Sequence, residues 1–271
     1  QDQWIYIQHV LQTIKDNNVD FIWVVNIDLK DLHKLLKIAI PIGIKISPYL
    51  MEIEPVHNNW NIDINNPETL EAPIKYYDST IKNAIDYLGD DIKGIYNWII
   101  ADQPMGSNIN LVEEVRKIFS NIDPSHPAIV VSAWYNFPEV ITNTSFPDIC
   151  ISLYPFFGPE NPFGPHTNES SQNFFTVNAE HATEETTRYN QKAWIMGQCF
   201  AQAKGPFDSD ERGHITVLPG GFVHWRSPSI PEVRWQLWEA IRCGIKGFIY
   251  FTALLANPAD VSAKPIDDPA F

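Results

Sequence analysis

Three consecutive residues, Asp102, Gln103 and Pro104, stand where an apolar, strand-like run ends, and their types suggest chemistry on a polar ligand. The carboxyl group of Asp102 can exchange a proton, so this residue is a candidate catalytic acid. The carboxamide of Gln103 has no titratable proton and can only donate and accept hydrogen bonds. An acid beside an amide is suited to bind the hydroxyl groups of a sugar, whether or not the site also cleaves it.

Other polar and aromatic side chains stand at the ends of predicted strands. Aromatic faces stack on the C–H surface of pyranose rings, while carboxylates and amides bind the hydroxyls. A long segment, residues 204–231, adds further candidates, since loops above about 12–15 residues tend to be functional. The alternative to sugar binding is burial in the core for each aromatic residue, and an internal salt bridge for Arg226. The predicted sugar-binding residues are Asn26, Trp98, Tyr154, Gln198, Trp225 and Arg226, and Trp98 is the one whose strand position could send it into the barrel wall.

The elements that must position these residues alternate between strand and helix patterns. One strand pattern ends at Asp102, and the others cover residues 19–27, 42–50, 127–134, 148–157, 193–201 and 247–255. Helical patterns cover residues 3–15, 28–40, 67–89, 110–121, 174–190 and 231–244. This alternation is typical of parallel β/α units.

Seven strand patterns in a chain that starts on a helix predict an α/β fold, a (β/α)8 TIM barrel that lacks the first strand and the last helix within this chain. The barrel domain is expected over residues 1–255, with residues 256–271 as a C-terminal extension or the start of a further segment. A doubly wound sheet is the competing fold, and the absence of a glycine-rich phosphate loop after an early strand weakens it.

Composition excludes several classes of partner. The chain has 271 residues and a net charge of −14, which argues against binding nucleic acid and suits a neutral glycan. No apolar run reaches about 18 residues, so we expect no membrane insertion. No histidine spacing typical of a metal site occurs, and we predict no metal and no cofactor. The sequons at Asn143 and Asn168 favour glycosylation and a secreted or cell-surface protein. The oligomeric state stays open.

The segment YNWIIADQP resembles a strand end in a clan of (β/α)8 glycoside hydrolases, where Asn/Asp-Glu-Pro ends the fourth strand and supplies the acid/base carboxylate. Asp102 and Pro104 match, and Gln103 replaces the Glu. A closer likeness is to bacterial glycoside-hydrolase-like proteins of poorly defined substrate, over about residues 19–255. The blocks that carry it are VRKIFSNIDPSHPAIVV, ISLYPFFG, WIMGQCF and LPGGFVHWRSPSIPEVRWQLWEAIRCGIKGFIYF. The resemblance implies a hydrolase acting on an oligosaccharide or polysaccharide.

The resemblance also implies a Glu nucleophile at the end of the seventh strand, where Gln198 stands. Retaining hydrolysis needs two carboxyl groups roughly 5–5.5 Å apart, and inverting hydrolysis needs a pair at roughly 6.5–9.5 Å. Three explanations are open: an engineered Glu→Gln substitution at residue 103, a natural pseudoenzyme that binds carbohydrate or serves as an extracellular scaffold, or catalysis by other carboxylates. In the third case Asp102 is the acid, and its partner is Glu52, Glu54 or Asp208.

Overall fold

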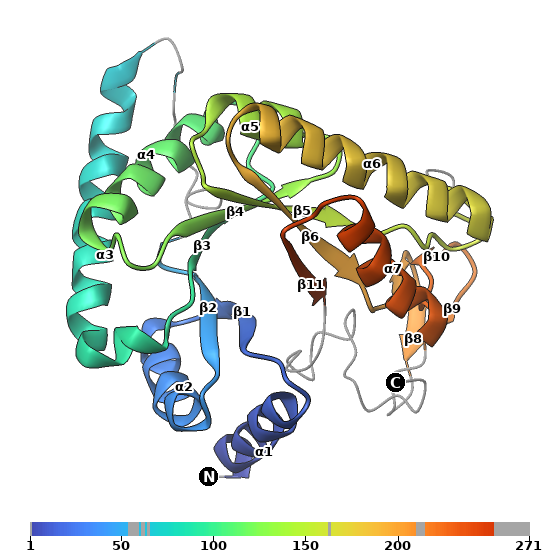
Figure 1. Ribbon diagram of the computed structural model, residues 1–271, viewed down its shortest axis with the longest axis horizontal. Helices are drawn as coiled ribbons and strands as arrows, with labels where there is room; N and C mark the ends of the chain where they lie inside the picture. Colours follow the sequence, from blue (N-terminus) through green and yellow to red (C-terminus); the bar gives the residue numbers. More distant parts are fainter. Residues whose placement is uncertain are drawn as a thin grey trace. The chain divides into compact units, whose positions relative to one another are not determined.

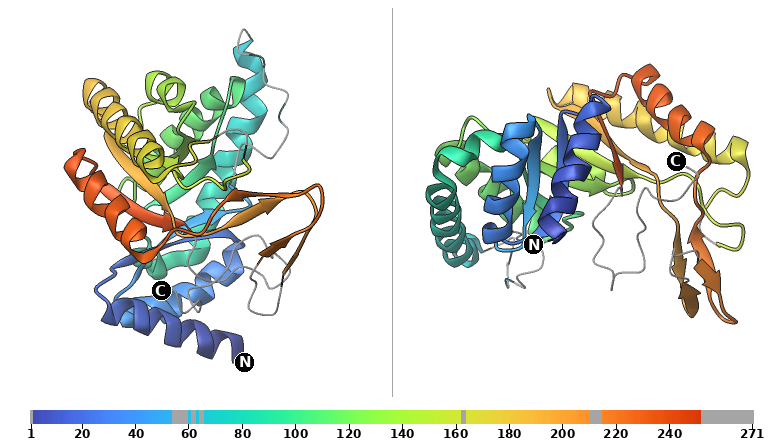
Figure 2. Two further views of the ribbon diagram at one scale, coloured as in Figure 1. Left: turned by 90° about the vertical axis from the view of Figure 1, so that its right-hand side faces the viewer. Right: turned by 90° about the horizontal axis from the view of Figure 1, so that it is seen from below.

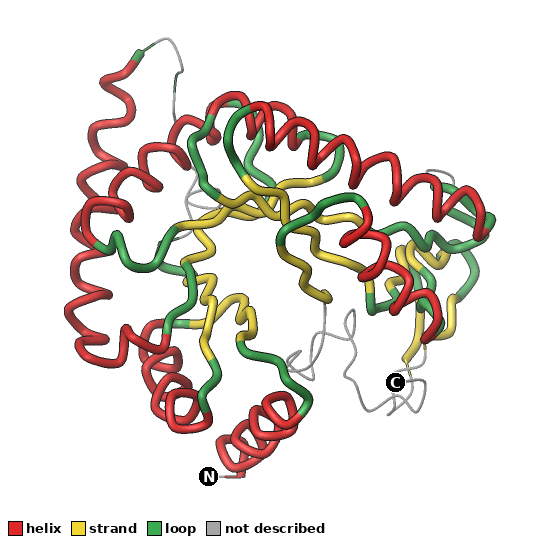
Figure 3. Tube along the Cα trace, viewed as in Figure 1, coloured by secondary structure: helices red, strands yellow, loops and turns green. Residues whose placement is uncertain are grey.

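The computed structural model describes residues 2–53, 60, 63, 66–161, 164–209 and 215–251. Its main sheet has seven strands in the order β1-β2-β3-β4-β5-β6-β11, which is their order along the chain. The strands are parallel and helices connect them, as Figures 1 and 3 show. The predicted α/β fold, a partial (β/α)8 barrel, is confirmed.

The elements have the following bounds. The strands of the main sheet are β1 (Phe21–Ile27), β2 (Lys45–Leu50), β3 (Trp98–Asp102), β4 (Ala128–Ala133), β5 (Asp148–Leu153), β6 (Lys192–Gln198) and β11 (Gly247–Phe251). The helices are α1 (Asp2–Asp16), α2 (Leu29–Ile42), α3 (Glu71–Leu88), α4 (Ser107–Ile122), α5 (Phe137–Asn143), α6 (Asn168–Arg188) and α7 (Ile230–Arg242), with 3-10 turns η1 (Pro67–Leu70) and η2 (Gly89–Gly94). Four short strands are β7 (Gln202–Lys204), β8 (Phe207–Ser209), β9 (Ile215–Val217) and β10 (Phe222–Trp225).

The chain forms two compact units: Gln1–Ser132 with Pro138–Ile149 is unit 1, and Ala133–Phe137 with Cys150–Phe271 is unit 2. In unit 1 the residue types at both ends of α2 account for where this helix begins and ends. Asp28 accepts a hydrogen bond from the backbone of Asp31 at its start, and Gly43 ends it with a φ of 80°. Its buried side recurs at helical spacing, at Leu32, Leu35, Leu36 and Ala39.

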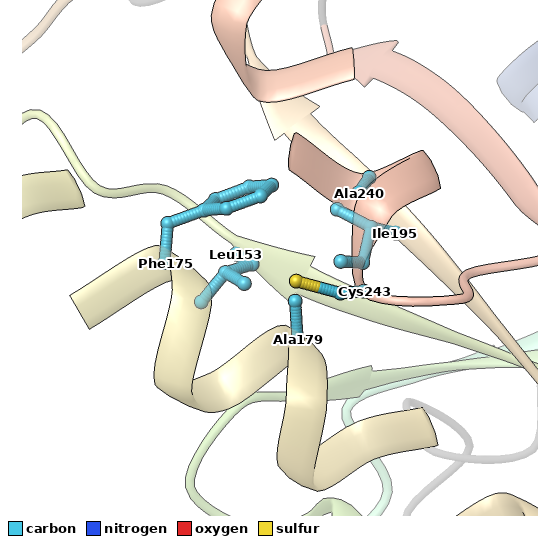
Figure 4. Close-up of a cluster of buried hydrophobic side chains, with 6 residues drawn as sticks. All are labelled: Leu153, Phe175, Ala179, Ile195, Ala240 and Cys243. Carbon is cyan, nitrogen blue, oxygen red and sulfur yellow. The ribbon is translucent and has the colours of Figure 1, made fainter. Parts of the chain in front are cut away.

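Unit 2 has its own core, in which helices α6 and α7 pack side by side against strands β5 and β6 (Figures 1 and 2). Figure 4 shows the buried cluster at this junction: Leu153, Phe175, Ala179, Ile195, Ala240 and Cys243. The three cysteines, Cys150, Cys199 and Cys243, are all buried.

The structure departs from the predicted elements mainly in unit 2. Residues 204–231, expected to be a loop, include antiparallel pairs: β10 pairs with β7 and β8 with β9, and Figure 2 shows them projecting together away from α6 and α7. Helix α6 starts at Asn168, earlier than expected, because Thr167 and Ser170 form a capping box there. The predicted extension, residues 256–271, lies outside the described residues. None of the described helices is long and apolar enough to cross a lipid bilayer.

Candidate functional site

The end of strand β3 holds Asp102 and Gln103 at a solvent-accessible edge. The four residues that precede Asp102 in β3 are buried, whereas Asp102 is exposed and Gln103 is partly exposed. Asp102 lies opposite Val131 of β4, and the backbone N–H of Gln103 donates to the carbonyl of Val131 at 2.8 Å. The ladder with β4 therefore fixes the backbone of both residues, at the carboxyl edge where (β/α)8 barrels carry their chemistry.

The backbone at Gln103 is also strained. Its φ is 50°, and Asn26, near the end of β1, has a φ of 54°. A residue with a Cβ pays about 1–2 kcal/mol for this left-handed conformation. Asn18 and Asn190 share it, but they follow the ends of α1 and α6, where a left-handed residue terminates the helix. Asn26 lies in the irregularity of the β1–β2 register between Val24 and Ile27, where a left-handed residue is common. Gln103 has no such explanation, and strain of this kind concentrates at functional positions.

Trp98 does not contribute to this edge. It is the first residue of β3, at the amino end, and only 1% of it is exposed. Its indole N–H donates to Asp123 Oδ2 at 2.8 Å, and the Nδ1 of His126 lies 2.9 Å from the other oxygen of the same carboxylate. Burial alone would raise the pKa of Asp123, but the bonds from His126 and Trp98 outweigh it and lower the pKa. The prediction that Trp98 binds sugar is therefore wrong, and its alternative placement in the barrel wall is confirmed.

Of the three proposed partners of Asp102, the structure describes Glu52 and Asp208. Glu52 follows β2, and its Oε1 accepts a hydrogen bond from the backbone N–H of Leu29 at 3.2 Å. Leu29 opens α2, so the carboxylate stabilises the positive end of that helix. Glu52 Oε2 is buried and lacks a hydrogen-bond partner in the part of the chain that is described. Glu54 lies outside the described residues, and Asp208 pairs with Thr216 in the β8–β9 ladder of unit 2.

Gln198, at the end of β6, is fully buried, with 0% of its surface exposed. Its Oε1 accepts from the N–H of Phe156 at 2.9 Å. Its Nε2 donates to three backbone carbonyls, those of Phe156 at 3.3 Å, Phe200 at 3.1 Å and Arg226 at 2.7 Å. These bonds join the end of β6 to the segments that follow β5 and β10. The prediction that Gln198 contacts a ligand is wrong, because the backbone already uses its whole amide.

A second buried amide, that of Gln236 on α7, completes this arrangement. Its Oε1 accepts from the N–H of Gln198, and its Nε2 donates to the carbonyl of Gln198, both at 2.8 Å. The two glutamines thus satisfy polar groups that burial would otherwise leave unpaired. Sequence reasoning missed Gln236, although a polar residue within the apolar run WQLW was a signal for it.

Aromatic rings gather at the ends of four strands of unit 2, β5, β6, β10 and β11. Tyr154 follows β5, and its ring lies 5.0 Å from Phe200, 5.3 Å from Trp225 and 6.1 Å from Phe251 between centroids. Tyr154, Trp225 and Phe251 are partly exposed. The Tyr154 hydroxyl donates to the Sδ of Met196 at 3.0 Å, which fixes the ring. The structure thus brings Tyr154 and Trp225 together, and it adds Phe200 and Phe251, which the sequence analysis did not name.

Arg226 forms an internal salt bridge, as the alternative interpretation held. Its guanidinium binds both carboxylate oxygens of Glu232, at 2.7 and 2.9 Å, and donates to Asn168 Oδ1 at 3.2 Å. The hydrogen bonds from Arg226 are the main reason that the pKa of Glu232 lies below its usual value. The guanidinium also lies 4.8 Å from the ring centroid of Phe156. The arginine therefore braces the start of α7, and the prediction that it binds sugar gains no support.

Both sequon asparagines are exposed. Asn143 is the last residue of α5, and its amide donates to the carbonyl of Glu139 at 2.8 Å. Asn168 is the first residue of α6. Glycosylation at both stays a prediction. Within the described ranges, no group of three His, Cys, Asp or Glu side chains could hold a metal ion.

Comparisons with known proteins bear on this arrangement. No protein-family model matches the chain, and no curated protein matches it. Solved structures do. The Cel5A endoglucanase of Pseudomonas stutzeri is 16% identical, with a TM-score of 0.52, over 70% of this chain and 66% of the other. A putative α-L-fucosidase of Bacteroides thetaiotaomicron is 13% identical, with a TM-score of 0.61, over 92% and 80%.

A family 1 β-glucosidase of Thermotoga maritima is 10% identical, with a TM-score of 0.51, over 90% of this chain and 76% of the other. The chain thus matches just under two thirds of the endoglucanase and larger shares of the other two enzymes. Identities this low carry the fold alone. The fold that this chain shares with them is the (β/α)8 barrel, of which it forms a part.

Proposed function

We propose that this protein binds an oligosaccharide or polysaccharide at the carboxyl ends of its strands and does not cleave it by double displacement. The observation that carries the proposal is Gln103. This amide occupies a solvent-accessible strand end, next to a carboxylate. Its backbone has a left-handed φ, and Gln103 does not terminate a helix as Asn18 and Asn190 do. The TIM-barrel glycosidases that the fold resembles support a carbohydrate as the ligand.

The chemistry of the two amides argues against retaining hydrolysis. Gln103 has no proton to give to a departing alcohol, and an amide cannot form the glycosyl ester. Gln198 is in addition enclosed by the backbone groups that it binds. Restoring a carboxylate at both positions would therefore require repacking around residue 198. This supports a natural binding protein over an enzyme disabled at one residue.

Within unit 2, the aromatic cluster offers a stacking surface of its own for a sugar. Tyr154 and Trp225 are partly exposed, and both rings pack edge-on against Phe200. An ordered ring costs little side-chain entropy when a sugar stacks on it. The proposal includes a secreted or cell-surface location, for which the two exposed sequon asparagines are the support.

Affinity electrophoresis in gels that contain soluble β-glucan, xylan or galactomannan tests binding. We expect retardation by at least one polysaccharide, and loss of it in Trp225→Ala. Trp238→Ala is the matched control, because Trp238 lies on α7 of the same unit with 68% of its surface exposed. Equal retardation of both variants would remove Trp225 from the site, and no retardation of the unchanged protein would end the proposal.

A second candidate is hydrolysis with Asp102 as the acid, which its exposed carboxylate at the strand end favours. Release of reducing ends from the same polysaccharides measures it. Under the binding proposal neither the unchanged protein nor Gln103→Glu releases any. Release by the unchanged protein that Asp102→Asn abolishes would establish the hydrolase instead. Release by Gln103→Glu alone would mean that residue 103 is a lost acid.

A further inference from the structure

A second aromatic group lies in unit 1, outside the predicted sugar-binding residues. Its members are Trp60, Tyr76 and Tyr77, with ring centroids 5.8 Å apart for Trp60 and Tyr76, and 5.0 Å apart for the two tyrosines. The indole N–H of Trp60 donates to the hydroxyl of Tyr77 at 3.1 Å. Tyr77 is fully buried, so it anchors Trp60 from the core side.

Tyr76 is the open member of this group. It is 41% exposed, although its neighbour Tyr77 has no exposed surface. Its hydroxyl donates to the backbone carbonyl of Glu52 at 3.5 Å, just past the end of β2. A ring that is held at its edge and by its neighbours, yet keeps a large part of its surface in water, has the geometry that stacking on a pyranose requires.

The group lies at the same edge of the sheet as Gln103. Strand β2 pairs with β3 in parallel, with Tyr49 opposite Ile99. Glu52 and Asp102 each stand three residues beyond this pair, so both lie at the carboxyl edge, one strand apart. Tyr76 is in the second turn of α3, the helix that leads away from this edge, and it contacts Glu52 there.

We propose that Trp60 and Tyr76 form a further stacking position, which takes a sugar unit of the same oligosaccharide that contacts Asp102 and Gln103. This inference rests on the proposed function and adds to it that the ligand is a chain of several pyranose units. A ligand too short to reach Tyr76 gains nothing from the position, whereas a longer one does. Affinity therefore depends on the length of the saccharide, and the dependence comes from Tyr76.

Isothermal titration with gluco-, xylo- and manno-oligosaccharides, from disaccharide to hexasaccharide, tests this with four proteins: the unchanged chain, Tyr76→Ala, Tyr76→Phe and Tyr87→Ala. Tyr87 is the matched control, since it lies on the same helix about three turns further on, at the opposite end, with 50% of its surface exposed. Tyr76→Phe keeps the ring and loses only the hydroxyl. Thermal unfolding of each variant shows that it is folded.

We expect Tyr76→Ala to bind the hexasaccharide about tenfold more weakly, a difference of about 1.4 kcal/mol. Its affinity for the disaccharide should not change, and Tyr76→Phe and Tyr87→Ala should bind every length as the unchanged chain does. Equal affinities of Tyr76→Ala and Tyr87→Ala for the hexasaccharide would overturn the stacking position and leave the proposed function intact. Absence of binding by the unchanged chain to every oligosaccharide would overturn both.

Discussion

Replacing Gln198 by Glu tests whether residue 198 is a buried structural amide or the position of a lost nucleophile. The substitution exchanges the Nε2 that donates to the carbonyls of Phe156, Phe200 and Arg226 for an oxygen that faces the same three acceptors. The amide has two N–H protons for these three carbonyls and a protonated carboxyl has one, so one donor is lost and a buried carbonyl is left unsatisfied, which costs about 1–3 kcal/mol. We therefore expect a cost of about 2 kcal/mol while the introduced carboxyl is neutral, and more once it ionises.

The cost depends on pH in a defined direction. Burial and three carbonyl oxygens disfavour the anion, so the folded-state pKa of the introduced carboxyl lies above its unfolded value of about 4.3. The folded state then binds the proton more tightly, and the free energy of unfolding falls as pH rises above the unfolded pKa. The slope is about 1.4 kcal/mol per pH unit until the folded-state pKa is reached.

Urea unfolding followed by tryptophan fluorescence at pH 5.5 and pH 8 measures this. Gln103→Glu is the matched control, since it makes the same chemical change at a partly exposed strand end, and we expect it to change stability by less than about 0.5 kcal/mol at either pH. At pH 5.5, about 1.2 units above the unfolded pKa, the buried substitution should lower the free energy of unfolding by about 3–4 kcal/mol, and at pH 8 by more. Equal stability of the two variants at both pH values would refute the assignment of Gln198 to a closed hydrogen-bond network.

Further predictions follow from the same contacts. Gln103→Gly should raise the free energy of unfolding by up to about 1 kcal/mol in urea titrations, because glycine adopts a φ of 50° without strain, and an unchanged or lower value would contradict the strain. Trp98→Phe should cost about 1–2 kcal/mol at pH 7 through loss of the bond to Asp123. Because the folded-state pKa of Asp123 is lowered, the difference should shrink as pH falls through that pKa, and chemical denaturation from pH 7 to pH 3 would show it. Arg226→Lys should destabilise by about 1 kcal/mol, since lysine cannot form the two-pronged contact with Glu232, and calorimetry in which the lysine variant matched the unchanged protein would rule this out.

The sequence predicted the elements well where local signals and packing agree. The apolar run of β1 and the caps of α2 follow from residue types alone, and both are observed near the expected positions. It failed where a segment owes its structure to distant partners. Residues 204–231 carry no strong strand pattern, yet they include β8, β9 and β10, because antiparallel pairing supplies the hydrogen bonds that a loop would take from water.

The candidate site divides in the same way. Sequence placed Asp102 and Gln103 at an accessible strand end, and the structure agrees. It could not show that Trp98 points inward to Asp123, since alternation along a strand fixes only which side chains share a face. The use of the Gln198 amide depends on three segments far apart in the chain, which no local pattern records.

Residue chemistry by itself determined that position 103 can bind a hydroxyl and cannot protonate a leaving group, because an amide has no acidic proton in any fold. The alternation of apolar strands and amphipathic helices likewise determined the α/β class. Only the tertiary structure decided which of the two glutamines at strand ends is accessible. Gln103 is partly exposed to solvent, whereas Gln198 is buried and hydrogen-bonded to backbone groups. The physical reason is that exposure and hydrogen-bond partners depend on which distant segments pack around a side chain, and two residues of the same type carry no difference that would reveal it.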